Sequence, residues 1–329
     1  MTFGVIGTNF ISDWFMAALP FANSEASAVY SRKKETGDAF ASRHGIPLVF
    51  DDLDAFLSSD AFDAVYIASP NFLHESQAVR ALRAGKHVLV EKPASPSLSG
   101  YLRACDEAKK QGRVYMEAMR PVHDGLLKKV KENLYRIGKV RSAHLEFCQY
   151  SSRYDRHKRG EYTNTFDPAL SNAAILDIGI YPIETAVWLF GTPKEVCGKS
   201  LILENGFEGA GEAVLAYGDH NVAISYSKVA DSLLPSVILG EAGGVTVDKL
   251  VLPTRAVFRF RSGEELVLTR EETKAATNMH DEILDFVRAI DACALLPEHK
   301  TTADALAVCD ALRKGAGVVF PSDSEDTGV

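Results

Sequence analysis

Short apolar runs alternate with amphipathic segments over about the first 120 residues, and this alternation constrains the fold more than any other feature of the chain. Amphipathic segments such as 76–84 and 97–110 are typical of helices, and Gly85 caps the first of them. The expected strands contain Val5-Ile6, Ala28-Val29-Tyr30, Ala64-Val65-Tyr66-Ile67, Val88-Leu89-Val90 and Val114-Tyr115-Met116. Repeated strand–helix units predict a parallel, doubly wound α/β sheet over residues 1–120.

The pattern changes near Pro121, after which strand-length runs of alternating polarity dominate the chain. A helix is expected over 124–137, a strand over 140–150, and further strands between 196 and 270. Hairpin turns are predicted at Gly218-Asp219-His220-Asn221 and Ser262-Gly263-Glu264, closing helices over 278–293 and 301–314, and a frayed acidic tail over 322–329. We therefore predict a second, α+β domain over 121–329 with a large, mostly antiparallel open sheet.

Charge and cysteine content argue against several classes of function. The net charge of −8 and a pI near 5.6 disfavour a nucleic-acid surface, because the basic runs are short and scattered. The five cysteines are far apart and form no C-x-x-C pair, which indicates reduced thiols and neither a disulfide framework nor a metal site. The chain shows no secretory signal, and charges interrupt every long apolar stretch. We expect a cytoplasmic protein with a small-molecule substrate and no membrane span.

The expected strand at 87–90 ends abruptly in Glu91-Lys92-Pro93. Pro93 disfavours helical backbone angles at Lys92, so the chain leaves the strand extended, with the lysine at its carboxyl end. The preceding strand is followed by Ser69-Pro70-Asn71, which places Asn71 at the same edge, where open α/β sheets bind their ligands. His74, in the first turn of the next helix, is typical of a packed or capping histidine. A solvated Glu–Lys pair on a loop is the alternative for Glu91 and Lys92.

The first expected turn, Gly7-Thr8-Asn9-Phe10-Ile11-Ser12, stands where a dinucleotide fingerprint G-x-G-x-x-G/A would stand, although only the first glycine is present. Asn9 is the non-glycine residue best suited to a left-handed backbone, and Ser12 is small enough for close helix–strand packing. Unpaired N–H groups at the following helix N-terminus would suit a pyrophosphate. The turn is either a phosphate-binding loop or an ordinary strand–helix connection.

The second expected strand ends in Tyr30-Ser31-Arg32-Lys33-Lys34, where a site for NAD usually carries an acid. A hydroxyl followed by basic side chains suits the 2′-phosphate of NADP(H), which a guanidinium can bind through two hydrogen bonds. We therefore favour NADP(H), with NAD(H) possible. A solvated basic helix start is the alternative.

A further informative stretch, residues 167–182, leads into an apolar helix expected over 183–190. Asp177 and Tyr181 are four residues apart, so in a helix they project from the same face. A polar pair on an apolar segment predicts either a site or a hydrogen bond within the core.

Together these motifs resemble the glucose-fructose oxidoreductase, inositol dehydrogenase and rhizopine catabolism family (Gfo/Idh/MocA), most strongly over residues 63–93 and 167–182. The resemblance implies an N-terminal Rossmann domain, a C-terminal open sheet that mediates dimers or tetramers, and NAD(P)-dependent oxidation or reduction of sugars, polyols or related alcohols. Tyr181, where the family often has histidine, is similar to the branch containing xylose dehydrogenases and dimeric dihydrodiol dehydrogenase. The chain departs from the family pattern at Asn9, Ser12 and Ser171-Asn172-Ala173.

The resemblance also implies roles for the candidate residues. Lys92 and Tyr181 are suited to exchange the proton of a substrate hydroxyl, and either can be the immediate donor. A lysine beside an oxidised nicotinamide should lose its proton more easily, and Asp177 would orient substrate hydroxyls or Lys92. Residues 151–166 are expected to help select the substrate. The cofactor-binding candidates are Gly7, Thr8, Asn9, Phe10, Ile11, Ser31, Arg32, Ser69, Pro70, Asn71, His74, Glu91 and Lys92.

Two other classes of function are compatible with the same motifs. Some relatives of this fold are NAD(P)-binding regulators without catalytic residues, and others are NAD-dependent glycosidases whose overall reaction is redox-neutral. Lys92, Asp177 and Tyr181 together favour an enzyme over a regulator. A net change in the absorbance of reduced nicotinamide would distinguish a dehydrogenase from both alternatives.

Overall fold

The computed structural model describes residues 1–270, 277–292, 298–321 and 323, and the chain forms two compact units. The first comprises Met1–Arg120 and Thr273–His299, and the second comprises Pro121–Glu272 and Lys300–Val329. The sequence analysis placed all of 121–329 in one domain, whereas helix α10 (Met279–Asp291) belongs to the first unit. The reason is the apolar face of α10, which joins the core of that unit.

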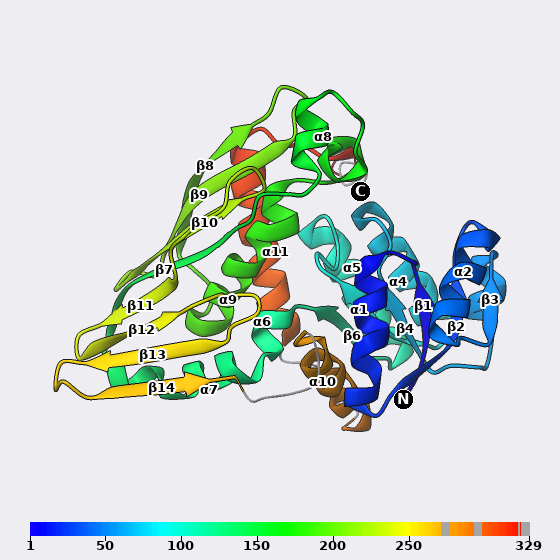
Figure 1. Cartoon of the computed structure of the whole chain (residues 1–329), viewed down its shortest axis with the longest axis horizontal. Helices are drawn as coiled ribbons and strands as arrows, with labels where there is room; N and C mark the ends of the chain where they lie inside the picture. The colour runs from blue at the N-terminus through cyan, green and yellow to red at the C-terminus, as the bar shows by residue number, and fades with distance from the viewer. Residues whose placement is uncertain (271–276, 293–297, 322, 324–329) are drawn as a thin grey trace. The chain divides into compact units, whose positions relative to one another are not determined.

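The first unit is built on a six-stranded sheet in which every pairing is parallel, in the order β3-β2-β1-β4-β5-β6 (Figure 1). The strands are β1 (Thr2–Ile6), β2 (Glu25–Tyr30), β3 (Leu48–Phe50), β4 (Ala64–Ile67), β5 (His87–Glu91) and β6 (Tyr115–Ala118). β4 and β5 are buried along almost their whole length, which explains why their sequences are continuous apolar runs. The predicted doubly wound parallel sheet is confirmed.

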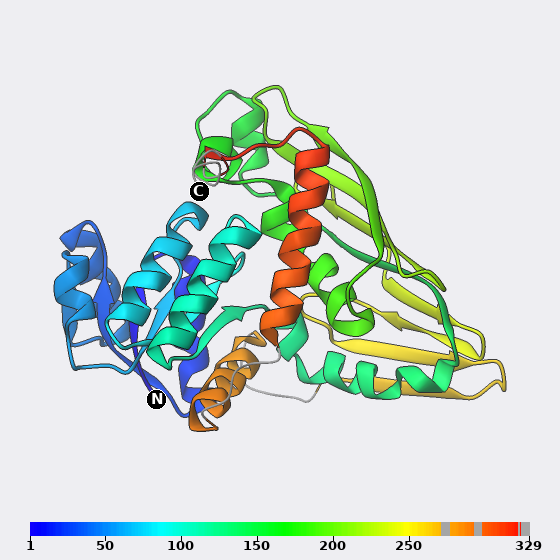
Figure 2. The same cartoon turned by 180° about the vertical axis from the view of Figure 1, so that it is seen from behind.

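Helices cover both faces of this sheet. They are α1 (Phe10–Ala18), α2 (Lys34–His44), α3 (Leu53–Leu57), α4 (His74–Arg83) and α5 (Leu98–Gln111), with 3₁₀ turns η1 (Leu19–Ala22) and η2 (Asn71–Leu73). α1 lies on the side seen in Figure 1, and α4 and α5 lie on the side seen in Figure 2. Ser97 caps α5, because its Oγ accepts a hydrogen bond from the amide of Gly100 at 3.3 Å. Gly85 has φ +78° just after α4, as its predicted capping role requires.

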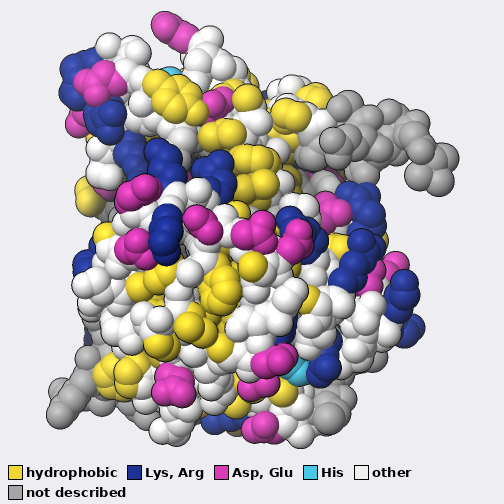
Figure 3. Space-filling model, turned by 90° about the vertical axis from the view of Figure 1, so that its right-hand side faces the viewer, with side chains coloured by type: hydrophobic (Ala, Val, Ile, Leu, Met, Phe, Trp, Pro, Cys, Tyr) yellow, Lys and Arg dark blue, Asp and Glu magenta, His cyan; other side chains and the backbone are white. Residues whose placement is uncertain are grey.

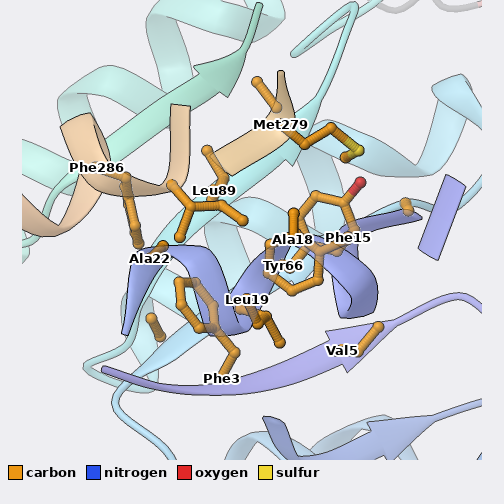
Figure 4. Packing of buried hydrophobic residues seen from close by; sticks show 14 of the residues in the cluster. Phe3, Val5, Phe15, Ala18, Leu19, Ala22, Tyr66, Leu89, Met279 and Phe286 are labelled. Atoms are coloured by element: carbon orange, nitrogen blue, oxygen red, sulfur yellow. The ribbon is translucent and has the colours of Figure 1, made fainter. Parts of the chain in front are cut away.

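The hydrophobic core of the first unit joins segments that are far apart in the sequence (Figure 4). The ring of Phe3 in β1 lies edge-on to Phe15 of α1, with centroids 5.3 Å apart, and 5.9 Å from the ring of Phe286 in α10. Met279 and Ile283 of α10 are also fully buried. Burying each such side chain stabilises the unit by about 1.5–3 kcal/mol, which explains why α10 packs there.

The second unit is built on an eight-stranded sheet in the order β14-β13-β12-β11-β7-β10-β9-β8 (Figure 1). Only β7 and β10 pair in parallel among the described strands, so the predicted mostly antiparallel open sheet is confirmed. Both predicted hairpin turns join neighbouring antiparallel strands, β9 to β10 and β13 to β14. The strands are β7 (Val140–Cys148), β8 (Glu195–Ile202), β9 (Glu208–Ala216), β10 (Asn221–Ser227), β11 (Ser236–Gly240), β12 (Gly243–Val247), β13 (Arg255–Phe260) and β14 (Glu265–Thr269).

Helices pack on one face of this second sheet. α7 contacts β13 and β14, α9 contacts β7 and β10, and Leu312 of α11 lies against Gly198 of β8. The described helices leave the opposite face of the sheet open (Figure 1). The helical segments are α6 (Arg120–His123), α7 (Gly125–Asn133), η3 (Leu134–Ile137), α8 (Tyr154–Lys158), η4 (Asn164–Phe166), η5 (Pro168–Leu170), the π-helical turn η6 (Ile175–Gly179), α9 (Ile180–Phe190) and α11 (Glu298–Gly315).

Within the described ranges, no helix combines the length and apolarity that crossing a bilayer requires. Cys105, Cys148, Cys197 and Cys309 are free thiols, while Cys293 lies outside the described residues, as does all of the predicted tail at 322–329 except Asp323. The face of the molecule shown in Figure 3 carries Lys and Arg side chains beside Asp and Glu side chains, without a single basic field.

Candidate active site

Four segments with predicted site residues lie at one edge of the parallel sheet, namely residues 7–11, 31–32, 69–71 and 91–92. The register pairs Ile6 of β1 with Tyr30 of β2 and with Ile67 of β4, and Ile67 in turn with Val90 of β5. The four segments therefore begin side by side, at the carboxyl edge where open α/β sheets bind their ligands.

Gly7 occupies a position that only glycine can take. Its φ is +105°, and a Cβ atom there would lie 2.5 Å from the carbonyl oxygen of Ala68. Its amide donates a hydrogen bond to the carbonyl oxygen of Tyr30 at 3.3 Å. The tight turn that a dinucleotide fingerprint needs at its first glycine is therefore present, and the turn fits a nicotinamide dinucleotide.

Asn9 is the N-cap of α1 and has an extended backbone (φ −87°, ψ 178°), so the predicted left-handed conformation is wrong. Its Oδ1 accepts hydrogen bonds from the amides of Ile11 (2.9 Å) and Ser12 (3.3 Å), and its Nδ2 donates to the carbonyl oxygen of Ala68 (2.7 Å). The expectation of unpaired N–H groups is therefore also wrong at these two amides. A short amide side chain takes this role because it satisfies donors that the helix leaves without partners.

Two exposed aromatic side chains lie beside this turn. Phe10, a predicted cofactor-binding residue, is 56% exposed, and its ring packs edge-on against Trp14 at 5.5 Å. The Arg120 guanidinium lies 5.9 Å from the Trp14 ring centroid. Sequence reasoning missed Trp14, although an aromatic pair four residues apart on the helix after a glycine turn is a usable signal. Thr8 and Ile11 are partly buried.

Ser31 and Arg32 follow β2 at the same edge. Ser31 Oγ lies 2.6 Å from Thr36 Oγ1, and the Ser31 amide donates to the carbonyl oxygen of Phe50 at 3.0 Å, so this connection is held in place. Arg32 is exposed, whereas Lys34 pairs with Asp38 across one turn of α2. A hydroxyl and a guanidinium thus stand at the strand end, which is the combination that a 2′-phosphate would need.

His74 joins two of the loops at this edge. It is 1% exposed, with Nδ1 2.8 Å from the carbonyl oxygen of Pro93 and Nε2 2.8 Å from that of Ser69. Burial lowers its pKa, although both carbonyl oxygens favour the charged ring. This is the packed position that the sequence suggested, and it conflicts with a direct cofactor contact because both ring nitrogens face main-chain carbonyls.

The loop that carries Lys92 is held by buried side chains. Besides the contact between Pro93 and His74, the amide of Ala94 donates to Oε1 of Glu117 at 2.6 Å. The hydroxyl of Tyr115 donates to the carbonyl oxygen of Ala94 at 3.2 Å. The Lys92–Pro93 peptide bond is cis, and Lys92 itself is partly buried. The hydrogen bonds at Pro93 and Ala94 therefore fix the backbone from which the Lys92 side chain extends.

Glu91 lies on the core side of the sheet. The hydroxyl of Tyr66 donates to its Oε1 at 2.6 Å, and the Tyr66 ring stacks on Phe15 at 3.7 Å. Burial raises the pKa of Glu91, and burial together with the charge of Glu91 raises the pKa of Glu282 in α10 well above its usual range. The Glu91 side chain thus supports the strand end from inside and does not fit the predicted cofactor contact. Sequence reasoning missed Glu282, which only the packing of α10 brings near.

The other two predicted catalytic residues lie in the second unit, on the continuous helical stretch formed by η6 and α9. Its first turn is π-helical, which the sequence did not predict. The Asp177 side chain is 36% exposed and forms an ion pair with Lys228, a residue that sequence reasoning missed. Tyr181 is buried, with its ring edge-on to Phe147 at 5.5 Å. The predicted catalytic set is therefore divided between the two units.

The segment expected to help select the substrate, residues 151–166, is built around packed rings. Phe166 packs with His157 at 5.0 Å and with Tyr154 at 5.6 Å between ring centroids. Phe166 also contacts Phe207 at 4.8 Å, and Nζ of Lys228 lies 5.8 Å from its ring centroid. These contacts place the segment beside the ion pair of Asp177 and Lys228.

Comparisons with known proteins identify the family of the chain. Residues 1–119 match an oxidoreductase family with an NAD-binding Rossmann fold, and residues 131–246 match the GFO/IDH/MocA C-terminal domain. The scyllo-inositol 2-dehydrogenase (NADP(+)) IolU of Bacillus subtilis is 39% identical over 325 residues, or 98% of each chain. The uncharacterized oxidoreductase YgjR of Escherichia coli is 37% identical over 330 residues, again 98% of each. A levoglucosan dehydrogenase solved with NADH and levoglucosan shares the fold, with a TM-score of 0.86 and 17% identity over 96% of this chain and 97% of that one.

Proposed function

Because the chain belongs to the Gfo/Idh/MocA family of NAD(P)-dependent oxidoreductases, we propose that its substrate is a cyclic polyol of the inositol class. One secondary hydroxyl is oxidised to a ketone, or the ketone is reduced in the reverse direction. The observation that carries this proposal is the 39% identity to a scyllo-inositol 2-dehydrogenase over 98% of both chains. Lys92, Asp177 and Tyr181 support it, because alcohol oxidation needs groups that bind the hydroxyl and remove its proton.

We assign the cofactor to the carboxyl edge of the first unit, with NADP(H) preferred. Residues 7–11 would hold the pyrophosphate, Ser31 and Arg32 the 2′-phosphate, and the loop at 69–71 together with Lys92 the rest of the dinucleotide. The crowded turn at Gly7 and the exposed guanidinium of Arg32 support this assignment. When bound, the nicotinamide supplies hydride exchange with the substrate carbon.

The side chains of the protein transfer the proton and orient the substrate. Lys92 and Tyr181 are the two candidates to accept the proton of the hydroxyl that is oxidised and to return it in the reverse direction, because an amine and a phenol can each act as a general acid and base. The carboxylate of Asp177 accepts hydrogen bonds from neighbouring hydroxyls of the polyol. His74 and Glu117 hold the Lys92 loop, and Glu91 supports the end of β5.

A substrate panel tests the proposal. The unmodified enzyme would be given scyllo-inositol, myo-inositol, xylose, levoglucosan and a vicinal diol, each with NADP+ and with NAD+, and reduced nicotinamide would be followed by absorbance. We expect the highest kcat/KM for an inositol with NADP+. A higher value for xylose or levoglucosan would refute the inositol class, and no net reduction with any substrate would favour a redox-neutral enzyme or a regulator instead.

We also propose that the chain self-associates through the open face of the eight-stranded sheet. In β9, Val214 is 39% exposed between two buried neighbours, and in β11, Leu239, at 50% exposure, stands between the buried Ile238 and the half-buried Gly240. Leu201 in β8 and Val267 in β14 are further exposed apolar side chains of this sheet. Light scattering after size-exclusion chromatography should give a multiple of the 35.8 kDa chain, and Leu239→Glu should lower it. A monomer at micromolar concentration would refute the proposal.

A further inference from the structure

Lys228 is a buried cation in direct contact with a predicted catalytic residue. Its side chain is 7% exposed, and its Nζ pairs with Oδ2 of Asp177. A buried ammonium group without a counter-charge would cost several kcal/mol, and the Asp177 carboxylate offsets part of that cost. Asp177 depends less on this pairing, because its side chain is 36% exposed and water can solvate a carboxylate there.

The backbone of Lys228 is held on both sides. Its amide donates to the carbonyl oxygen of Gly209 at 2.9 Å, and its own carbonyl oxygen accepts from the amide of Ser151 at 2.9 Å. Immediately before it, Oγ of Ser227 accepts from the amides of Val229 (3.1 Å) and Ala230 (2.9 Å) and closes the turn. The backbone of Lys228 is therefore fixed by these hydrogen bonds, and its side chain extends from there to Asp177.

The turn that carries Asp177 is attached to β9 and β10, the two strands that also hold the backbone around Lys228. Glu208 of β9 accepts hydrogen bonds from the amide of Ile175 at 2.8 Å and from the hydroxyl of Tyr226 in β10 at 2.6 Å. Gly179 lies flat against the Tyr226 ring, where a Cβ atom would come within 2.9 Å. These contacts fix the two ends of η6, and Lys228 holds the side chain in its middle.

We propose that Lys228 is a positioning residue of the substrate site, whose ammonium group holds one oxygen of the Asp177 carboxylate and thereby directs the other towards a hydroxyl of the polyol. The inference rests on the proposed role of Asp177 in binding substrate hydroxyls. A carboxylate has about four lone-pair sites, so it can accept from Lys228 and from a substrate hydroxyl together. Lys228 thus determines which hydroxyl arrangement the site accepts, without touching the reacting atoms.

The test uses the full-length enzyme with NADP+ and scyllo-inositol or myo-inositol as substrate. Lys228→Met removes the charge at similar volume, and Lys228→Arg keeps it. We expect Lys228→Met to raise KM for the preferred inositol about 10- to 100-fold, with kcat changed less than about fivefold, since a lost charge-assisted hydrogen bond is worth about this much. Lys228→Arg should restore KM to within about fivefold of the unmodified enzyme. NADPH affinity, measured by fluorescence, should stay constant and serves as the control for folding.

A double-mutant cycle separates positioning from general structural support. In an Asp177→Asn background, Lys228→Met should change KM by less than about twofold, because there is no carboxylate left to position. Lys199→Met, on the exposed part of β8, is the matched control and should leave both KM values unchanged. If Lys228→Met fails to fold, Lys228→Gln provides a neutral variant that can still donate a hydrogen bond.

The outcomes distinguish this inference from the proposed function. An unmodified enzyme that oxidises neither inositol overturns the proposed function and this inference with it. An active unmodified enzyme whose KM is unchanged in Lys228→Met, or whose Lys228→Met effect persists in full in the Asp177→Asn background, overturns the positioning role alone.

Discussion

Lys92 in the first unit and Asp177 in the second are both polar residues of the proposed reaction, but the protein holds them in different ways. Lys92 follows a buried parallel strand, and the loop around it is fixed through its main chain, by His74 at Pro93 and by Glu117 at Ala94. Asp177 lies in a helical turn and is fixed through its side chain, by an ion pair with Lys228.

This difference shows how two kinds of sheet build a site. A parallel sheet places its loops at one edge by topology, so a motif directly after a strand predicts its own location. In the second unit, η6 packs on the middle of a mostly antiparallel sheet, where β9 and β10 provide Glu208 and Tyr226 and the turn after β10 provides Lys228. Substitutions in the two units should therefore have different effects on turnover, binding and stability.

The largest effect is expected for Lys92→Met. Loss of a general acid–base partner should lower kcat by roughly 10²- to 10⁴-fold with an inositol and NADP+, while NADPH affinity changes by less than about twofold. Steady-state absorbance assays measure kcat, and fluorescence titration measures the NADPH affinity. Lys34→Met, an exposed lysine of the same unit, is the control. Turnover within threefold of the unmodified enzyme would remove Lys92 from the mechanism.

Tyr181→Phe examines the same chemistry in the second unit. The ring keeps its edge-on packing against Phe147, so the thermal midpoint should hardly change, whereas kcat should fall by roughly 10²-fold. Steady-state kinetics and calorimetry provide the comparison, with Tyr135→Phe at an exposed position as control. An unchanged kcat would assign the proton to Lys92 alone.

Arg32→Ala tests cofactor choice at the edge of the parallel sheet. Removing charge-assisted hydrogen bonds to a 2′-phosphate costs about 1.5–3 kcal/mol, so the Kd for NADPH should rise roughly 10- to 100-fold. The Kd for NADH should remain within about twofold, as should both values in Lys34→Ala. Equal losses for NADPH and NADH would contradict the phosphate contact.

Gly7→Ala tests whether the turn at Gly7 is crowded. The comparison is Gly112→Ala, where the glycine is required only for its positive φ. Both Gly7 and Gly112 have positive φ, but a Cβ atom meets Ala68 at Gly7 and nothing within 4 Å at Gly112. We expect Gly112→Ala to cost about 1 kcal/mol of unfolding free energy, and Gly7→Ala to cost about 2–3 kcal/mol and to weaken NADPH binding. Chemical denaturation and titration measure both. Equal costs would show that the turn is not crowded.

The smallest effect concerns the buried carboxyl groups behind Lys92. Burial and the charge of Glu91 raise the pKa of Glu282, so the folded state binds more protons than the unfolded state above the ordinary value near 4.5. Stability therefore falls as pH rises through that value towards the raised one, and the penalty persists above it. Glu282→Gln should stabilise the protein near pH 8, and the gain should shrink as pH falls towards the ordinary pKa of a glutamate.

Thermal unfolding across that pH range measures this effect, with the exposed Glu25→Gln as the control in the same unit. A gain that does not depend on pH would show that Glu282 is not the titrating group.

Much of the first unit could be predicted from the sequence, because its signals are local. Continuous apolar runs such as the one before Glu91 identify parallel strands, and the residues after each run then share an edge by topology. Predictions from local sequence were wrong where the role of a residue depends on the contacts of its side chain and not on its backbone angles. Asn9 was expected to replace a glycine by its backbone angle, but its side chain caps α1 instead.

The sequence by itself determined the fold class, the family, the two sheets and the positions of Lys92, Asp177 and Tyr181 along the chain, because periodicity and short motifs depend only on neighbouring residues. Only the tertiary structure decided that α10 belongs to the first unit, that the Glu91 side chain faces inwards, and that Lys228 pairs with Asp177. Each of these depends on a contact between residues distant in sequence. Such contacts are selected by burial and charge pairing in the folded chain, and no local pattern records them.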